Sequence, residues 1–209
     1  WQAATGTDLH EALGMSEVST YLSGAPERPA PMGTAGYPQP GRRVAILDDD
    51  LAPVPRGTPG QLAVGAEDPG LALTCPGQED RFAARLQAGW FLTGDLAQMA
   101  EDGAITTLGR ADDLMNAGGF RVAPAEVEGA LAALPGLTEC AVCAVPTPSG
   151  AEIIAALYAG EADPADLAAG AAQLLSPYKC PRHWQRIDHL PRSANGKIDR
   201  KALPGLVIL

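Results

Sequence analysis

GRADDLMNAGGFRV, the stretch at residues 109–122, marks the point where the pattern of the sequence changes. Before it, closely spaced glycines and prolines divide the chain into short apolar segments, which is typical of strands and turns. After it, longer segments alternate between the apolar spacing of helices and that of strands. We therefore predict an α+β chain: a β-rich unit over residues 1–109 followed by a compact α+β unit over residues 110–209.

The expected strands of the first unit cover residues 43–47, 61–64, 90–92 and 104–108. In the second unit we expect helices over 124–134, 164–175 and 199–203, and strands over 140–145, 152–158 and 183–187. The helix that begins at Pro124 is the clearest of these, because proline suits the first turn and Glu126 and Glu128 lie at the positive end of the helix dipole.

The composition excludes several classes of partner. The 209 residues carry 15 basic and 25 acidic side chains, a net charge of −10, which disfavours nucleic acid or an anionic membrane surface as the main partner. No apolar run approaches the ~20 residues that a membrane-spanning helix needs, and no secretory signal is visible. We expect a cytoplasmic protein without a membrane span, and the sequence leaves a homodimer open.

Two local patterns resemble metal sites and have simpler interpretations. Cys140 and Cys143 have the CxxC spacing, but they lie in a strand-like run without a second cysteine pair, which favours a buried strand over a metal or redox site. Asp48, Asp49 and Asp50 form an acidic run shortly before Pro53, and such a run more often caps a turn than binds a metal ion.

The residues that suggest chemistry lie in three places. Asp95 ends a Thr-Gly-Asp turn, Arg110 follows 15 residues later, and Lys197 lies in the glycine-containing segment NGKIDR at residues 195–200. A short acid can accept hydrogen bonds from ribose hydroxyls, an arginine fork suits ribose and phosphate oxygens, and a lysine on a glycine hinge is a movable cation. These are the groups that a nucleotide-handling site requires.

With LGMSE at residues 13–17, GWFLTGD at 89–95 and the stretches quoted above, the sequence resembles the C-terminal half of the adenylate-forming (ANL) superfamily. That superfamily contains acyl- and aryl-CoA synthetases, adenylation domains of nonribosomal peptide synthetases and beetle luciferases. The resemblance implies that residues 1–109 end a large N-terminal domain in a distorted β-barrel subdomain. It also implies that residues 110–209 form a small, mobile lid domain with a hinge near Asp112.

The resemblance also implies roles for individual residues. Gly14, Met15, Ser16, Asp95 and Arg110 would bind the nucleotide, with Asp95 as the ribose ligand.

Three further roles come from the same resemblance. Glu17 would be the magnesium ligand, and Lys197 would be the catalytic residue that bridges the acyl carboxylate and the α-phosphate. The loop of Gly118, Gly119 and Phe120 would shape the channel for the thiol of coenzyme A.

The function implied is that of an ATP-dependent acyl- or aryl-CoA synthetase, an AMP-forming acid-thiol ligase. It would use ATP, Mg²⁺ and coenzyme A to convert a small carboxylic acid first to an acyl-adenylate and then to a thioester. One alternative is an adenylating enzyme that loads a carrier protein, and another is a non-catalytic nucleotide-binding fragment.

The chain begins at Trp1 and contains no Gly- and Ser/Thr-rich phosphate loop of the kind that the superfamily carries upstream. We therefore expect it to be the C-terminal part of a longer enzyme and to be inactive in isolation. An N-terminal segment, in the same protein or as a separate chain, would complete it.

Overall fold

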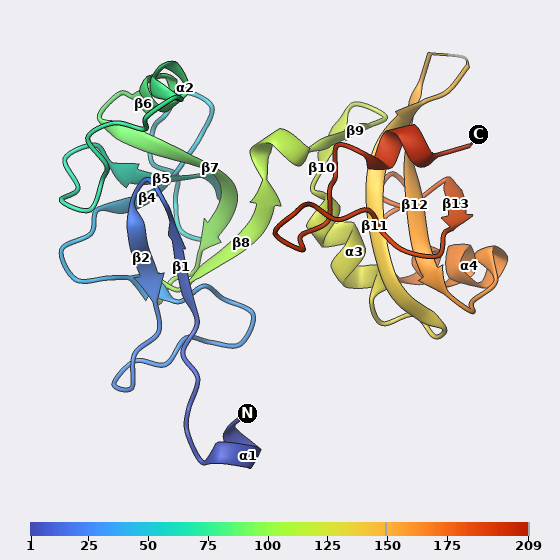
Figure 1. Cartoon of the computed structure of the whole chain (residues 1–209), viewed down its shortest axis with the longest axis horizontal. Helices are drawn as coiled ribbons and strands as arrows, with labels where there is room; N and C mark the ends of the chain where they lie inside the picture. Colours follow the sequence, from blue (N-terminus) through green and yellow to red (C-terminus); the bar gives the residue numbers. More distant parts are fainter. Residues whose placement is uncertain (149, 209) are drawn as a thin grey trace. The chain divides into compact units, whose positions relative to one another are not determined.

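The computed structural model describes residues 1–148 and 150–208 and contains two compact units, Trp1–Ala111 and Asp112–Leu209 (Figure 1). The division falls two residues beyond the predicted boundary between 109 and 110. The mixed α+β class is confirmed. The roles of the units as the end of a large domain and a mobile lid, with Asp112 as the hinge, stay a prediction.

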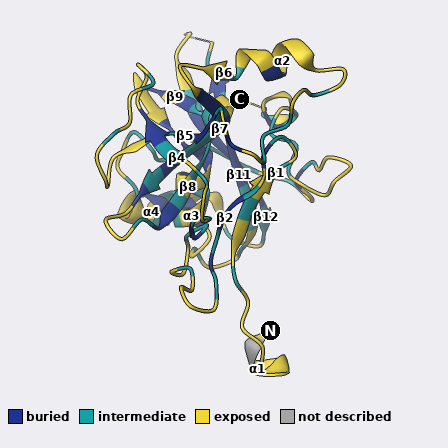
Figure 2. Cartoon of the chain, turned by 90° about the vertical axis from the view of Figure 1, so that its left-hand side faces the viewer, coloured by how far each residue is buried: buried dark blue, intermediate teal, exposed yellow. Residues whose placement is uncertain are grey.

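The first unit consists mainly of antiparallel strands. Its elements are α1 (Gln2–Thr5), β1 (Ala12–Met15), β2 (Ser19–Ser23), β3 (Tyr37–Pro38), β4 (Val44–Leu47), β5 (Pro59–Gly65), α2 (Glu79–Ala84), β6 (Leu86–Gln87), β7 (Trp90–Met99) and β8 (Ile105–Arg110). One sheet has the order β1-β2-β3, and the other has the order β4-β5-β7-β6 with β8 paired to β7. In Figure 2 the buried residues lie along these strands, whereas the surface of α2 is mostly exposed.

All four strands expected in this unit are present, but β7 is much longer than predicted. It runs to Met99 because β5 and β8 pair with it along its length, with a bulge between Leu96 and Ala97 on the β8 side. The local sequence hides this extension, since Gly94 and Asp95 belong to residue types that are depleted in strands. Phe91 of β7 belongs to a hydrophobic cluster that also contains Tyr21, Leu62 and Ile105, and all four side chains are fully buried.

The second unit combines a sheet with two covering helices. Its elements after η1 (Ala111–Asp113), a 3₁₀ turn that straddles the boundary, are β9 (Met115–Ala117), β10 (Phe120–Val122), α3 (Pro124–Leu131), β11 (Leu137–Pro146), β12 (Glu152–Gly160), α4 (Pro164–Leu174), β13 (His183–Arg186) and η2 (Leu203–Leu206). The main sheet has the order β11-β12-β13, in which β11 and β12 are antiparallel and β12 and β13 are parallel. Helix α4 makes the crossover between the parallel strands, so the predicted β-α-β alternation is confirmed.

Two helix predictions in this unit need correction. Helix α3 ends at Leu131 and not at residue 134, because the chain turns there toward Gly136. The terminal helix predicted over 199–203 is wrong: this segment makes only turns, with Ala202 N–H donating to Asp199 O at 3.1 Å and Leu203 N–H to Arg200 O at 3.3 Å, and a 3₁₀ helix forms later, at Leu203–Leu206. Pro204 lacks the N–H that an α-helix would require at Arg200 O.

The two alternatives to metal sites are borne out. The Asp48 carboxylate accepts hydrogen bonds from the backbone N–H groups of Asp50, at 3.0 Å, and Ala52, at 2.9 Å, and so caps the turn after β4. Cys140 and Cys143 both lie on β11 and face opposite sides of it, since each packs into a different hydrophobic cluster. Among the described residues, no helix combines the length and apolar character that crossing a membrane requires.

The burial of these two thiols predicts slow alkylation. Burial raises the pKa of Cys140 to about 12 and that of Cys143 to about 11, and the thiolate is the reactive form. At pH 8 we therefore expect iodoacetamide to label both cysteines at least about tenfold more slowly in the folded protein than after unfolding in urea. Peptide mass spectrometry measures both rates, and labelling as fast in the folded protein would contradict the strand packing.

The N-cap of α4 gives a second prediction. The Asp163 side chain accepts a hydrogen bond from the Ala165 N–H at 2.8 Å. Asp163→Ala should therefore cost α4 about 1 kcal/mol, or roughly fivefold faster amide exchange over the helix. Asp163→Asn is the matched control, because asparagine also caps helices, and equal effects of the two variants would contradict the cap.

Candidate functional site

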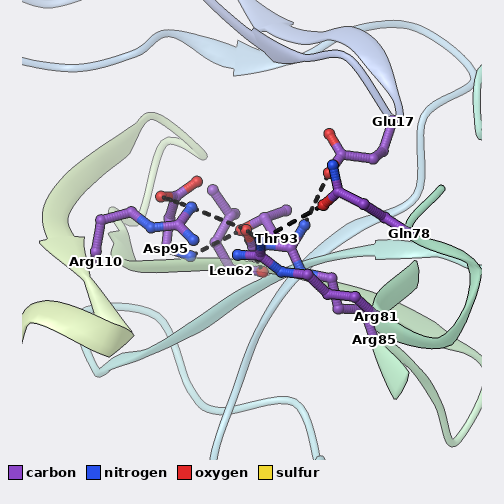
Figure 3. Close-up of polar contacts among 8 residues, drawn as sticks. All are labelled: Glu17, Leu62, Gln78, Arg81, Arg85, Thr93, Asp95 and Arg110. Atoms are coloured by element: carbon purple, nitrogen blue, oxygen red, sulfur yellow. Dashed lines mark hydrogen bonds and ion pairs between the residues drawn. The ribbon is translucent and has the colours of Figure 1, made fainter. Parts of the chain in front are cut away.

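Asp95 and Arg110 lie opposite each other on β7 and β8, where they are register partners. Arg110 Nη1 lies 3.0 Å from Asp95 Oδ1, and both side chains are partly exposed (Figure 3). Two residues that are 15 positions apart in sequence are thus adjacent because the β7–β8 hairpin pairs them. The structure therefore brings together an acid and an arginine that the sequence predicted as nucleotide ligands.

Thr93 is a buried residue that contacts both members of this pair. Its hydroxyl donates to Leu62 O at 2.8 Å and accepts the backbone N–H of Asp95 at 3.1 Å. Its carbonyl accepts from Arg110 Nη1 at 3.2 Å and from Arg85 Nη2 at 2.7 Å. Thr93 therefore fixes the direction of Asp95 and is the point where two guanidinium groups converge.

Gly94 is required at this point by its conformation and by its neighbours. Its φ is +78°, in the left-handed region. A Cβ atom on it would lie 2.7 Å from Arg110 Nη2 and 2.9 Å from Arg85 Nη2. A side chain at position 94 would therefore displace both arginines from the Thr93 carbonyl.

Glu17 extends the cluster through the second arginine. It lies in the turn between β1 and β2, just after Gly14 and Met15, which end β1, and Ser16, which opens the turn. Glu17 Oε1 is 3.0 Å from Arg85 Nη1. The predicted metal ligand and the predicted ribose ligand are therefore linked through Arg85, the Thr93 carbonyl and Arg110.

Sequence reasoning missed Arg85. This residue follows the short helix α2 and belongs to none of the motifs, so its sequence position carries no signal. Only the fold shows it, since the α2–β6 segment pairs with β7 and turns the side chain toward Thr93.

Tyr21 lies beneath the cluster as a neutral group. It is fully buried, and burial, reinforced by the charge of Asp95, raises the pKa of its phenol far above the ordinary value. The phenol therefore adds no charge that would compete with Asp95 for Arg110.

Lys197 lies in the second unit, at the end of a tight exposed loop. The backbone N–H of Ser193 donates to Lys197 O at 2.8 Å, and an isolated β-bridge joins Arg192 to Ile198. Arg192 also pairs with Glu139 on β11 at 2.6 Å. The loop is thus anchored at its base while the Lys197 side chain extends from an exposed residue.

A partly buried ion pair holds the segment that follows Lys197. Arg200 binds Glu128 of α3 through two hydrogen bonds of 2.7 Å each, and Glu128 also accepts the backbone N–H of Val142. Arg200 lies 3.6 Å from Asp113, next to the predicted hinge residue Asp112, which is exposed in η1. The segment that carries Lys197 is therefore tied to α3 and β11 through Arg200 and Glu128.

Gly118 and Gly119 form the turn between β9 and β10, with φ values of +61° and +89°. Phe120 follows and stacks on Tyr178, with ring centroids 4.5 Å apart, although more than half of its surface stays exposed. A small pocket of about 150 Å³ beside this turn is lined by Gly118, Tyr178 and Arg182, among others. The predicted thiol-channel loop is therefore a defined hairpin with an aromatic contact.

The residues suit a magnesium ion only together with a nucleotide. Within residues 1–148 and 150–208, no group of three or more His, Cys, Asp or Glu side chains is arranged to hold a metal ion. Glu17 supplies one carboxylate, and Mg²⁺ in nucleotide sites is bound by one or two carboxylates, substrate phosphates and water. Glu17 fits that donor set, and its partner Arg85 is a cation suited to the phosphates.

Comparison with known proteins finds similarity to AMP-binding enzymes and CoA ligases. Residues 126–197 match the AMP-binding enzyme C-terminal domain. The chain is 34% identical to the mitochondrial acyl-coenzyme A synthetase ACSM5 of Mus musculus, covering 97% of this chain and 37% of that protein. It is 33% identical to benzoate–CoA ligase of Thauera aromatica, covering 96% of this chain and 39% of that protein. The chain thus spans less than half the length of these relatives.

The fold of this chain also matches part of a solved CoA synthetase structure. The o-succinylbenzoate coenzyme A synthetase MenE of Bacillus subtilis, in complex with ATP and magnesium, superposes with a TM-score of 0.83 and 26% identity. The match covers 97% of this chain and 42% of that one.

Proposed function

Because the chain belongs to the ANL superfamily as the C-terminal portion of an acyl-CoA synthetase, we propose that it works as part of an ATP-dependent acyl- or aryl-CoA ligase. The reaction converts a carboxylic acid and ATP to an acyl-adenylate and pyrophosphate, and the thiol of coenzyme A then displaces AMP. The observation that carries this proposal is the pairing of Asp95 with Arg110, which also donates to the Thr93 carbonyl.

The first unit contributes nucleotide binding. Asp95 accepts hydrogen bonds from the ribose hydroxyls, and Arg110 donates to ribose and phosphate oxygens from the same side. Gly14, Met15 and Ser16 line the nucleotide at the end of β1. Glu17 would hold Mg²⁺ together with ATP, and the ion would supply charge neutralisation of the phosphates.

The second unit contributes the group that acts on the reacting atoms. The Lys197 ammonium pairs with the acyl carboxylate and with the α-phosphate, where negative charge accumulates as the carboxylate attacks. The ion pairs of Arg192 with Glu139 and of Arg200 with Glu128 anchor the two ends of the loop that carries the lysine. Such preorganisation reduces the reorganisation needed at the moment of reaction.

For the second half-reaction, the hairpin of Gly118, Gly119 and Phe120 guides the pantetheine arm. Glycines without side chains let an extended ligand approach the backbone closely. Rotation of the second unit near Asp112 exchanges the Lys197 loop for this hairpin, and a preceding segment supplies the phosphate loop and most of the acyl pocket.

The nature of the acceptor tests the proposal. The complete ligase, given ATP, Mg²⁺ and a panel of aliphatic and aromatic acids, should form CoA thioesters that mass spectrometry detects. Product on a phosphopantetheinyl carrier protein, with none on free coenzyme A, would favour a carrier-loading enzyme instead. Absence of either product with every acid would favour a non-catalytic nucleotide-binding module.

A further inference from the structure

Arg85 is bound at three points beside the predicted metal ligand. One guanidinium nitrogen contacts Glu17 at 3.0 Å, and the other donates to Thr93 O at 2.7 Å. The guanidinium carbon lies 5.4 Å from the centroid of the Phe91 ring. Its backbone is fixed as well, since Arg85 O accepts the Leu92 N–H at 2.9 Å.

These contacts place a fixed positive charge on the carboxylate that is proposed to face Mg²⁺. The side chains of Glu17 and Arg85 are 24% and 18% exposed, so water screens their interaction only partly. A divalent cation that approached Glu17 alone would be repelled by this guanidinium and would have to displace it. A cation that arrives with a triphosphate brings phosphate oxygens, which accept hydrogen bonds from arginine well.

Resting on the function proposed above, we propose that Arg85 is a phosphate-binding residue that keeps Glu17 from binding a divalent cation until the cation arrives with a nucleotide. In the nucleotide-free protein the guanidinium of Arg85 is ion-paired with the Glu17 carboxylate. When the metal–nucleotide complex binds, the same guanidinium turns to the phosphates, and Glu17 becomes available to the metal. Arg85 thereby couples metal binding to nucleotide binding.

Two equilibrium measurements on the full-length protein, without acid or coenzyme A, test this coupling. Mn²⁺ binding is followed by electron paramagnetic resonance without nucleotide, and ATP binding by calorimetry with EDTA present. For Arg85→Gln we expect Mn²⁺ to bind at least about tenfold more tightly than in the wild type, and metal-free ATP at least about tenfold more weakly. If Arg85 only supported the local structure, its loss would not raise the affinity for Mn²⁺ while lowering the affinity for ATP.

The matched control is Arg43→Gln. Arg43 likewise pairs with a carboxylate, Glu67 at 2.7 Å, and lies over an aromatic ring, that of Trp90, but it is exposed and outside the cluster. Neither affinity should change in this variant. The double variant Arg85→Gln/Glu17→Gln should lose the added Mn²⁺ affinity. This loss would identify Glu17 as the ligand, and the Mn²⁺ binding that remains would measure the contribution of other acidic sites.

The proposal is overturned if Arg85→Gln leaves Mn²⁺ affinity unchanged or weaker. If that variant does not fold, Arg85→Met replaces it: methionine keeps an unbranched side chain without the charge, so Mn²⁺ affinity should still rise. An unchanged value there overturns the proposal equally. These binding measurements involve no reaction. If the variants shift the Mn²⁺ and ATP affinities as expected but the wild type activates no acid in a separate assay, the proposed function is refuted and the role of Arg85 is not.

Discussion

Replacing Lys197 by alanine in the complete ligase should slow acyl-adenylate formation by about 10²–10³-fold, or roughly 3–4 kcal/mol of barrier. The ammonium is the charge proposed to meet the carboxylate and the α-phosphate as negative charge develops, and removing one preorganised stabiliser of this kind has an effect of that size. Thioester formation from supplied acyl-adenylate should continue at close to the wild-type rate, because coenzyme A brings its own nucleophile. Rapid-quench measurement of each half-reaction separates the two rates.

The chain offers a close control for this variant. Lys201 is exposed, lies four residues further along the same segment and has no role in the proposed chemistry. Lys201→Ala should therefore leave both half-reactions unchanged. Equal losses in the two half-reactions of Lys197→Ala would contradict its role in adenylation, since they would indicate damage to the whole unit.

Replacing Asp95 by alanine should weaken ATP binding by about 10²–10⁴-fold. The carboxylate is proposed to accept a hydrogen bond from each ribose hydroxyl, and a hydrogen bond to a charged group contributes about 1.5–3 kcal/mol. Asp95→Ala also removes the ion pair that Arg110 makes at 3.0 Å, which leaves the hydrogen bond from Arg110 to the Thr93 carbonyl in place. Calorimetric titration with MgATP measures the change.

Two further variants show whether this loss is specific. Glu67→Ala deletes another ion-paired carboxylate of the same unit, the exposed partner of Arg43, and should leave ATP affinity unchanged. Asp95→Asn keeps the shape and one acceptor oxygen, so it should fall between the wild type and alanine. A wild-type affinity in Asp95→Ala would refute the ribose assignment.

The sequence was informative where a motif and its local structure coincide. The apolar run at residues 90–92 predicted the start of β7. Asp95 and Arg110, which were both predicted as nucleotide ligands, lie next to each other because β7 pairs with β8. The opposite facing of Cys140 and Cys143 also followed from the two-residue period of a strand.

The sequence was uninformative where the decisive partner lies far along the chain. Arg85 belongs to no motif, and its role depends on Glu17, 68 residues away. The helix predicted at 199–203 failed for a local reason that the prediction overlooked: Pro204 has no backbone N–H to donate to Arg200 O. Propensity describes neighbours in sequence, so it carries no information on a contact such as that of Arg85 with Glu17.

In the proposed function, these residues complete a site that activates a carboxylic acid with ATP. Carboxylate-dependent exchange of labelled pyrophosphate into ATP by the full-length protein, compared with its Lys197→Ala variant, is the decisive test of this activity. We predict exchange that requires both an acid and Mg²⁺ and that falls about 10²–10³-fold in the variant. A wild-type protein that binds MgATP but shows no acid-dependent exchange, or a variant that exchanges as fast as the wild type, would contradict the claim.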